Sequence, residues 1–180
     1  MTVSIVYGFA EGPWHGKKLR KSLKDSDIRL VNGVRESDVV IAHSGGCFML
    51  PSNVKAKLII LVDPPYLDIH PLKEVINSVF HARIHKSWFI KFPVDGYYFI
   101  TRISTWIKMN NNINKLNWPT TKSARVVIVR NYLDNFSDVK TLKKLAKDKG
   151  WAFKELPGAH EDIWNSTDSY VQLIKKYNSI

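Results

Sequence analysis

The sequence predicts an α/β protein in which a mostly parallel central sheet of about six strands has helices on both faces. Short runs of β-branched and apolar residues alternate along the chain with lysine-rich amphipathic stretches, which is typical of strands joined by crossover helices. Between Lys57 and Val62 the chain is almost entirely apolar, which indicates a strand buried on both faces of a parallel sheet. Because such crossovers are right-handed, we expect the carboxyl ends of the strands at one edge.

The individual elements follow from the same patterns, taken in chain order. The strands are expected at residues 2–7, 28–31, 39–42, 57–62, 125–130 and 151–156. The helices are expected at residues 14–23, 72–84, 98–113, 138–149 and 161–177. Asp138 is a suitable N-cap for the fourth helix, and Gly150 is a natural stop for it. The helix after Ser44 must be short because Pro51 ends it.

Length and composition fit one folded domain that spans residues 1–180. Hydrophobic residues make up 44% and charged residues 24%, which excludes a disordered chain. The single cysteine excludes an internal disulfide framework and suits a reducing compartment. The N-terminus has no basic signal-peptide region and no apolar run reaches the length of a membrane span, so we expect a cytoplasmic protein.

The net charge of +11 is the unusual bulk property of the chain. A strongly basic chain can bind nucleic acid or an anionic surface. The lysines, however, are spread over several predicted helices with acidic residues among them. No arginine-rich tract, RNA-binding aromatic signature or metal-finger spacing accompanies them. The pattern therefore favours a solvated lysine-rich surface over nucleic-acid binding.

The stretch from residue 38 to residue 50 carries the strongest functional signal. A buried strand leads directly to Ser44, which small residues flank, and the apolar start of a short helix follows. This is the pattern of a nucleophile elbow, in which a tight strand-to-helix turn exposes a serine hydroxyl above the sheet. Such a turn brings the backbone on either side close to neighbouring elements, so the positions two before and two after must be small. Ala42 and Gly46 occupy these positions.

An aspartate and a histidine follow two other predicted strands. Asp134 comes shortly after the strand that ends near Arg130, and His160 follows the last strand. Because the carboxyl ends of parallel strands meet at one edge of a sheet, both side chains are expected to converge with Ser44. Asp63 also ends a strand and is the alternative acidic partner.

These features make the chain similar to the α/β-hydrolases, in particular to compact serine hydrolases with little or no separate lid. The order Ser, Asp, His along the chain is also that of the family. The motifs that carry the resemblance are Tyr7-Gly8-Phe9, Ala42-His43-Ser44-Gly45-Gly46, the Asp134 loop and Pro157-Gly158-Ala159-His160-Glu161-Asp162-Ile163-Trp164. The two antiparallel strands that usually open the fold have no counterpart before Ser44, so the resemblance implies a trimmed α/β-hydrolase fold.

The resemblance implies hydrolysis of an ester, thioester or amide bond through an acyl-serine intermediate, most of all a carboxylesterase-type activity. In this interpretation Ser44 is the nucleophile, and His160 takes its proton and then gives it to the leaving group. Asp134 orients the histidine and stabilises its charged form. The backbone N–H groups of Phe9 and Gly45 form the oxyanion hole.

Three other candidate groups in the sequence point to structural roles. His81 and His85 have a spacing that zinc enzymes use, but the glutamate of a His-Glu-x-x-His motif and a third ligand are missing, so we expect no metal and no cofactor. Cys47 is expected in the core. The side chain of His43 is expected to point away from its neighbour Ser44, because adjacent strand residues face opposite sides.

The expected partner is a small molecule with an acyl group. Aromatic residues concentrate between residues 68 and 118, where hydrolases of this type insert a small helical cap. These aromatics form either such a cap over an apolar pocket or a cover for the sheet. Two other functions stay open, namely a non-catalytic binding protein of the same fold and a basic nucleic-acid-binding domain. The sequence does not indicate the oligomeric state.

Overall fold

The structure is a computed structural model that describes residues 1–8, 11–51, 54–65, 97, 100–101, 124–134 and 136–178. The predicted cap at 68–118 and the predicted helices at 72–84 and 98–113 lie outside this part of the chain, apart from residues 97, 100 and 101. Phe9, His81 and His85 lie outside it as well. Within the described ranges, no helix combines the length and the apolar character needed to cross a membrane.

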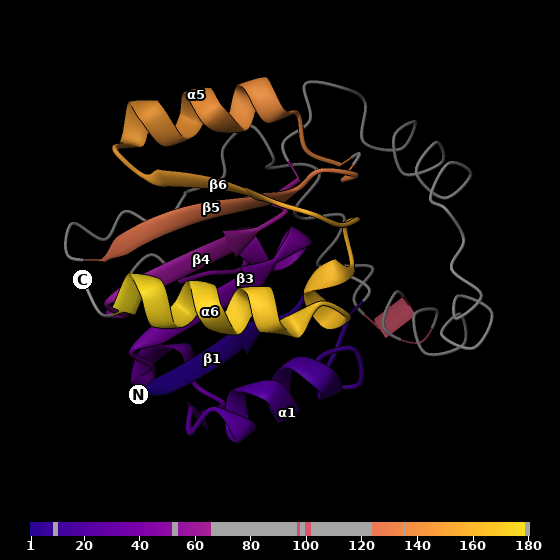
Figure 1. Cartoon of the computed structure of the whole chain (residues 1–180), viewed down its shortest axis with the longest axis vertical. Coiled ribbons are helices and arrows are strands. Elements are labelled where there is room, and N and C mark those ends of the chain that lie inside the picture. The colour runs from indigo at the N-terminus through magenta and orange to yellow at the C-terminus, as the bar shows by residue number, and fades with distance from the viewer. Residues whose placement is uncertain are drawn as a thin grey trace.

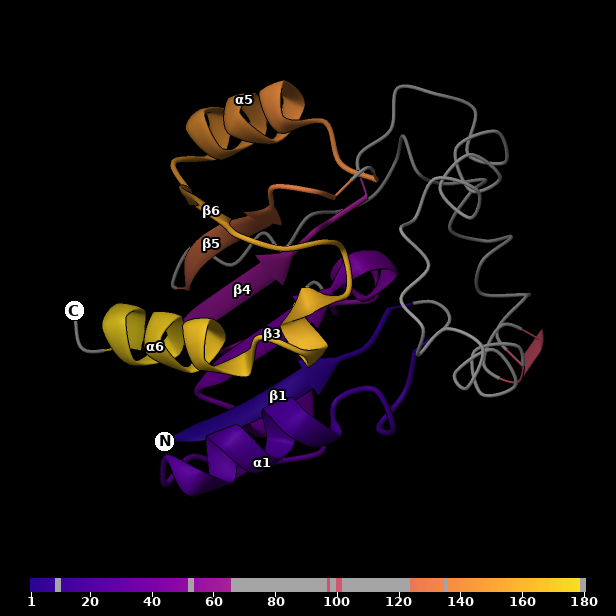
Figure 2. The same ribbon diagram turned by 45° about the vertical axis from the view of Figure 1, so that its right-hand side comes forward.

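Six strands form one parallel sheet (Figure 1), which confirms the predicted fold class. The strands are β1 (Thr2–Val6), β2 (Arg29–Leu30), β3 (Val39–His43), β4 (Leu58–Val62), β5 (Arg125–Asn131) and β6 (Ala152–Leu156). Their order across the sheet is β2-β1-β3-β4-β5-β6, and every neighbouring pair is parallel. The strands therefore all point to the same edge, as Figure 2 shows.

The strand order reverses between β1 and β3. The chain runs from β1 outward to β2 at the edge of the sheet and then returns to place β3 on the other side of β1. Such a switch point leaves a crevice outside the carboxyl ends of the two strands, where open α/β sheets bind ligands. Ser44 directly follows β3, so the topology alone places it at this crevice.

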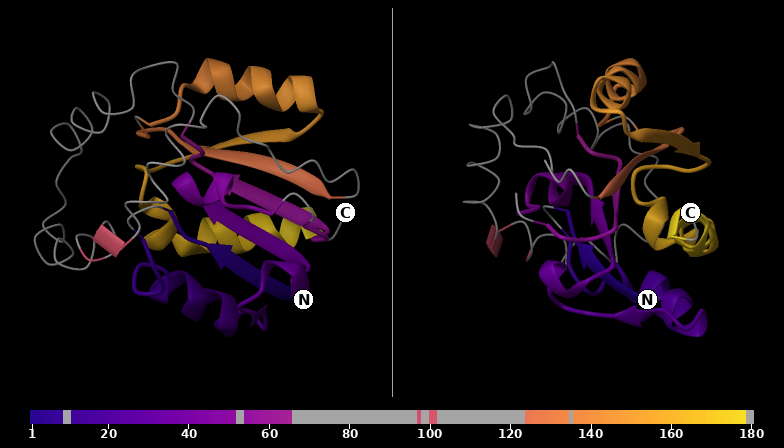
Figure 3. Two further views of the ribbon diagram at one scale, coloured as in Figure 1. Left: turned by 180° about the vertical axis from the view of Figure 1, so that it is seen from behind. Right: turned by 90° about the vertical axis from the view of Figure 1, so that its left-hand side faces the viewer.

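Helices cover both faces of the sheet. Helices α1 (Lys17–Asp25) and α6 (Thr167–Asn178) pack against each other on one face, and α5 (Val139–Lys149) covers the other. Helix α6 crosses in front of the strands in Figure 1 and lies behind them in the rear view of Figure 3. The short 3-10 helices are η1 (Val34–Glu36), η2 (Ser44–Phe48) and η4 (Asp162–Trp164).

Strand β3 contributes side chains to the hydrophobic cores on both faces of the sheet. All five of its residues are buried. Val39 and Ile41 join the core under α1 and α6, whereas Val40 and Ala42 join the core under α5. Strand side chains alternate between the two faces, so a strand covered on both sides must be apolar throughout. The same rule explains why the predicted strand at residues 57–62 is confirmed as β4.

The described helices match their predictions to different degrees. Asp138 caps α5 by accepting a hydrogen bond from the Thr141 N–H at 2.7 Å, and Gly150 ends it in the left-handed region with a φ of 66°. One continuous helix at residues 161–177 is wrong, because the chain forms η4 and begins α6 only at Thr167. Asp162 closes a separate turn here, since its carbonyl accepts the Ser166 N–H at 2.7 Å.

Candidate active site

Ser44 begins the tight turn between β3 and η2. Its φ of 50° lies in the left-handed region, which residues other than glycine rarely adopt. Gly46 explains part of this geometry, because a Cβ atom there would lie 2.6 Å from the carbonyl oxygens of both Val6 and Tyr7. Only glycine therefore lets the turn pack against the end of β1. A strained serine followed by an obligatory glycine fits the pattern of a nucleophile elbow.

The helix that begins at Ser44, η2, is a short 3-10 helix of five residues, as the position of Pro51 led us to expect. Ser44 is partly exposed, and Gly45 is buried at the start of the turn. The Gly45 N–H is one of the two expected oxyanion donors. The other, on Phe9, lies outside the described residues. Cys47 is buried, and its thiol contacts the Ala42 carbonyl oxygen at 3.2 Å, which confirms the expected core position.

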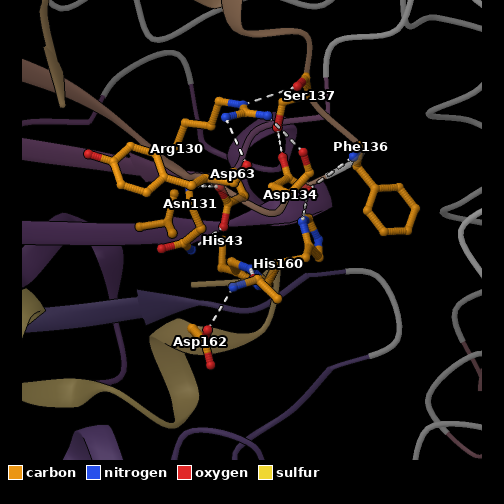
Figure 4. A network of polar contacts seen from close by, with 12 residues as sticks. His43, Asp63, Arg130, Asn131, Asp134, Phe136, Ser137, His160 and Asp162 are labelled. Atoms are coloured by element: carbon orange, nitrogen blue, oxygen red, sulfur yellow. Dashed lines mark hydrogen bonds and ion pairs between the residues drawn. The ribbon is translucent and has the colours of Figure 1, made fainter. Parts of the chain in front are cut away.

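His160 and Asp134 are in direct contact (Figure 4). The Nδ1 atom of His160 lies 2.8 Å from the Oδ1 atom of Asp134. The Asp134 side chain is fully buried, whereas 18% of the His160 side chain is exposed. The ring of Phe136 packs against the imidazole with a centroid distance of 4.6 Å. The two residues that were expected to pair after β5 and β6 therefore do pair.

Asp134 is held in place by its own loop. Its Oδ1 accepts the Phe136 N–H at 3.0 Å, and its Oδ2 accepts the hydroxyl of Ser137. The Arg130 guanidinium donates to the Asp134 carbonyl oxygen at 2.9 Å. A carboxylate that is buried and fixed by several donors can orient a histidine without moving itself.

The pKa of His160 is raised to about 9. Burial by itself would lower this pKa, but the negative charge and the hydrogen bond of Asp134 outweigh burial, and Asp63 and Glu11 add to the effect. Within the described residues, no hydrogen bond joins the Ser44 hydroxyl to His160. Such contacts often tighten only when substrate binds.

The turn that presents His160 depends on Gly158 and Asp162. Gly158 has a φ of 132°, and a Cβ atom there would collide with the Asp162 carboxylate. That carboxylate accepts a hydrogen bond at 2.6 Å from the backbone N–H of Ala159, the residue just before His160. Asp162 thus shapes the loop of the proposed base.

Asp63 occupies the equivalent position at the end of β4 but has different partners. It is fully buried with a φ of 45°, and its carboxylate accepts the Asn131 N–H at 2.7 Å together with the Asn131 side-chain amide. Tyr170 in turn donates to the Asn131 Oδ1 at 2.9 Å. Burial, and to a lesser degree the charge of Asp134, raises the pKa of Asp63 to about 6, although His160 and His43 oppose the shift.

His43 and Glu11 form a second pair beside the first, which sequence reasoning missed. His43 Nδ1 lies 2.7 Å from Glu11 Oε2, and His43 Nε2 lies 2.7 Å from the His160 carbonyl oxygen. The two imidazole centroids are 4.8 Å apart. No local signal marks Glu11, because it stands in a turn-rich loop and meets its partners only through the fold.

Glu11 is surrounded by donors. Its two oxygens accept the Gly8 N–H and the Trp164 indole N–H, each at 2.7 Å. Burial by itself would raise the pKa of Glu11, but the attraction of His43 and the hydrogen bonds from His43 and Trp164 outweigh it and lower the pKa to about 2.

Ligand atoms of His43, Asp63 and His160 lie within 4.8 Å of one another, a spacing that a metal ion could span. Both ring nitrogens of His43 and the Nδ1 of His160 are already engaged in hydrogen bonds. A metal needs a free lone pair on each ligand. The cluster is therefore explained as a hydrogen-bond network, and we assign no metal to it.

No protein-family model matches the sequence, and no curated protein matches it. Solved structures do. A 2-hydroxy-6-oxo-6-phenylhexa-2,4-dienoate hydrolase from Rhodococcus sp. strain RHA1 superposes with a TM-score of 0.74 at 10% identity, over 99% of this chain and 90% of that one. A structure from a study of carboxylesterases of the thaumarchaeon Nitrososphaera gargenis superposes with a TM-score of 0.67 at 9% identity, over 99% and 89%.

The chain has an α/β-hydrolase fold. A thioesterase domain from the curacin biosynthetic pathway shares it as well, with a TM-score of 0.60 at 11% identity over 97% of this chain and 90% of that one. In the described part of this α/β-hydrolase fold the sheet contains parallel strands alone, which agrees with the expected trimming. At these identities the similarity establishes the fold, and the chemistry has to be argued from the site.

Proposed function

We propose that the protein is a serine hydrolase that cleaves an ester, thioester or amide bond through an acyl-serine intermediate, with carboxylesterase-type activity. The observation that carries the proposal is the His160–Asp134 contact of 2.8 Å at the same sheet edge as the strained turn of Ser44. The similar structures include carboxylesterases, a thioesterase domain and an enol-lactonase, which supports this reaction class.

The proposed reaction begins with attack by the Ser44 hydroxyl on the substrate carbonyl carbon. The unprotonated Nε2 of His160 takes the hydroxyl proton during the attack, since a serine hydroxyl is a weak nucleophile on its own. Asp134 keeps Nε2 directed outward by holding Nδ1, and it stabilises the imidazolium that forms. His160 then gives the proton to the leaving group, and water hydrolyses the acyl-serine by the same steps.

The negative charge on the substrate oxygen needs donors in this scheme. We assign one to the Gly45 N–H, which directly follows the nucleophile, and the other to the Phe9 N–H. Removing one such donor in an acyl-transfer enzyme costs about 10²–10³-fold in rate. The substrate is proposed to be a small molecule with an apolar acyl group, with residues 68–118 proposed as its cap.

Labelling with a fluorophosphonate probe tests the proposal directly. The native chain is expected to react, because the probe modifies serines that a neighbouring base activates. Ser44→Ala should abolish labelling and hydrolysis of a short-chain nitrophenyl ester while leaving the circular dichroism spectrum unchanged. Ser37→Ala is a matched control, since Ser37 is a buried serine at the other end of β3.

The outcomes separate the alternatives. Labelling that requires both Ser44 and the native fold would support the proposal. A folded native chain that does not react would instead favour the non-catalytic binding protein, and steeply salt-dependent binding of a DNA or RNA oligonucleotide would then be the next test.

A further inference from the structure

His43 has a hydrogen-bond acceptor at each ring nitrogen. Glu11 Oε2 lies 2.7 Å from Nδ1, and the backbone carbonyl oxygen of His160 lies 2.7 Å from Nε2. A neutral imidazole has one N–H and one lone pair, so it can donate to only one of these partners. A carbonyl oxygen carries no hydrogen, and therefore Nε2 must be protonated. The remaining question is whether the second proton belongs to His43 or to Glu11.

The donors around Glu11 decide the position of that proton. The carboxylate already accepts the Gly8 N–H and the Trp164 indole N–H, each at 2.7 Å. These two fixed donors stabilise the charged form of the carboxylate, and an Nδ1–H on His43 would be a third. A protonated Glu11 would lose acceptor capacity while these donors stay buried around it.

We propose that His43 is an imidazolium that bridges the Glu11 carboxylate and the backbone carbonyl of His160, and that it is a positioning residue for the proposed catalytic pair. Its side chain is fully buried, so the charge must be balanced inside the protein. Glu11 supplies that balance from the loop after β1, and the Asp63 carboxylate approaches from the end of β4. The ring of His160, and the edge-on ring of Trp164 from η4, complete its surroundings.

The bridge explains how two distant strand ends are brought together. Strands β4 and β5 separate β3 from β6 in the sheet, so no ladder of hydrogen bonds joins β3 to β6. His43 immediately precedes Ser44, and its Nε2–H bond reaches the backbone of His160 directly. The distance between nucleophile and base is thereby set by one charged hydrogen bond. This positioning role rests on the proposed function, whereas the protonation state of His43 does not.

Nitrogen-15 NMR of the full labelled chain tests the protonation state. Two-bond proton–nitrogen correlations of histidine rings distinguish a doubly protonated ring from either neutral tautomer, and His43→Gln and His160→Gln assign the signals. At pH 7 both ring nitrogens of His43 are expected to be protonated. A spectrum with one unprotonated His43 nitrogen would overturn the proposal.

Glu11→Gln separates the charge from the hydrogen bond to His160. The glutamine amide can donate to Nδ1, so His43 should become neutral and keep its Nε2–H on the His160 carbonyl. The spectrum of this variant is expected to show an unprotonated Nδ1, and persistent double protonation would contradict the role of Glu11 as counter-charge. Asp148→Asn, an exposed acid on α5, is the matched control and should leave the His43 signals unchanged.

The positioning role has its own kinetic readout. Removing the bridge in His43→Leu, whose side chain has no hydrogen-bonding group, should lower kcat for a nitrophenyl ester by about 10²-fold with little change in KM, because a displacement near 1 Å at a reacting group has an effect of that size. A folded His43→Leu variant with native kcat would refute positioning. If the native chain hydrolyses no ester at all, the proposed function fails while the NMR result still decides the state of His43.

Discussion

Two histidine–carboxylate pairs lie side by side at the sheet edge, and we propose that only one of them takes part in proton transfer. In each pair an Nδ1 atom contacts a carboxylate oxygen, at 2.7 Å for His43 with Glu11 and at 2.8 Å for His160 with Asp134. The pairs differ at Nε2. That atom of His43 is bound to a backbone carbonyl, whereas that of His160 has no hydrogen-bond partner among the described residues.

The two histidine side chains also differ in their exposure to solvent. The His43 side chain is fully buried, and 18% of the His160 side chain is exposed. A histidine whose two nitrogens are both engaged can carry charge and hold structure, while one with a free nitrogen can accept a proton from a reacting group. The second nitrogen, rather than the paired carboxylate, therefore distinguishes the two roles.

The largest expected effect comes from breaking the His160–Asp134 pair, here called the outer pair. Asp134→Asn should reduce kcat by about 10⁴-fold, because an asparagine favours the wrong imidazole tautomer. Asp63→Asn is the matched comparison, since it removes the neighbouring carboxylate and leaves the His160–Asp134 contact in place. Ester hydrolysis by both variants measures the difference. A larger loss in Asp63→Asn would move the acidic role to the end of β4.

The His43–Glu11 pair, here called the inner pair, should matter more for the stability of the fold than a surface ion pair does. Glu11→Ala leaves a buried charge without its partner and is expected to lower the free energy of unfolding by about 3–5 kcal/mol. Lys57→Ala removes a surface ion pair with Asp38 and should cost about 1 kcal/mol or less. Urea unfolding curves measure both changes, and equal effects would contradict the distinction.

The acid sensitivity of the inner pair has a definite sign. The folded-state pKa of Glu11 is lowered to about 2 from 4.5, so its stabilisation is present above pH 4.5 and is lost as the pH falls toward 2. Native protein should therefore lose stability in that range more steeply than Glu11→Gln does.

The last expected effect is the pH dependence of turnover. The pKa of His160 is raised to about 9, and a general base must be unprotonated, so kcat/KM should rise about tenfold per pH unit below 9. Asp63→Asn removes a negative charge that contributes to this shift, so the rise should move to lower pH. Initial rates with a neutral ester from pH 6 to 10 measure both profiles. A native profile that is flat between pH 7 and 9 would show that His160 is not the base.

Sequence reasoning was most successful where a single element determines the outcome. The apolar run of β4, the Asp138 cap and the glycine two residues after Ser44 each follow from local geometry and burial. It was less successful at the C-terminal helix, where the chain forms the short η4, closes a turn by the bond from the Ser166 N–H to the Asp162 carbonyl, and begins α6 only at Thr167. It left Asp134 and Asp63 as alternatives, since both follow parallel strands.

The sequence by itself determined the strand pattern, and with it the single sheet edge at which Ser44, Asp134 and His160 all emerge. Which carboxylate contacts which histidine was decided only by the tertiary structure. The ends of β4 and β5 lie next to each other. There Asn131 donates to the Asp63 carboxylate, whereas the Asp134 carboxylate contacts His160. Glu11 meets His43 and Trp164 across 32 and 153 residues of chain, and contacts over such separations have no local signature because folding alone creates them.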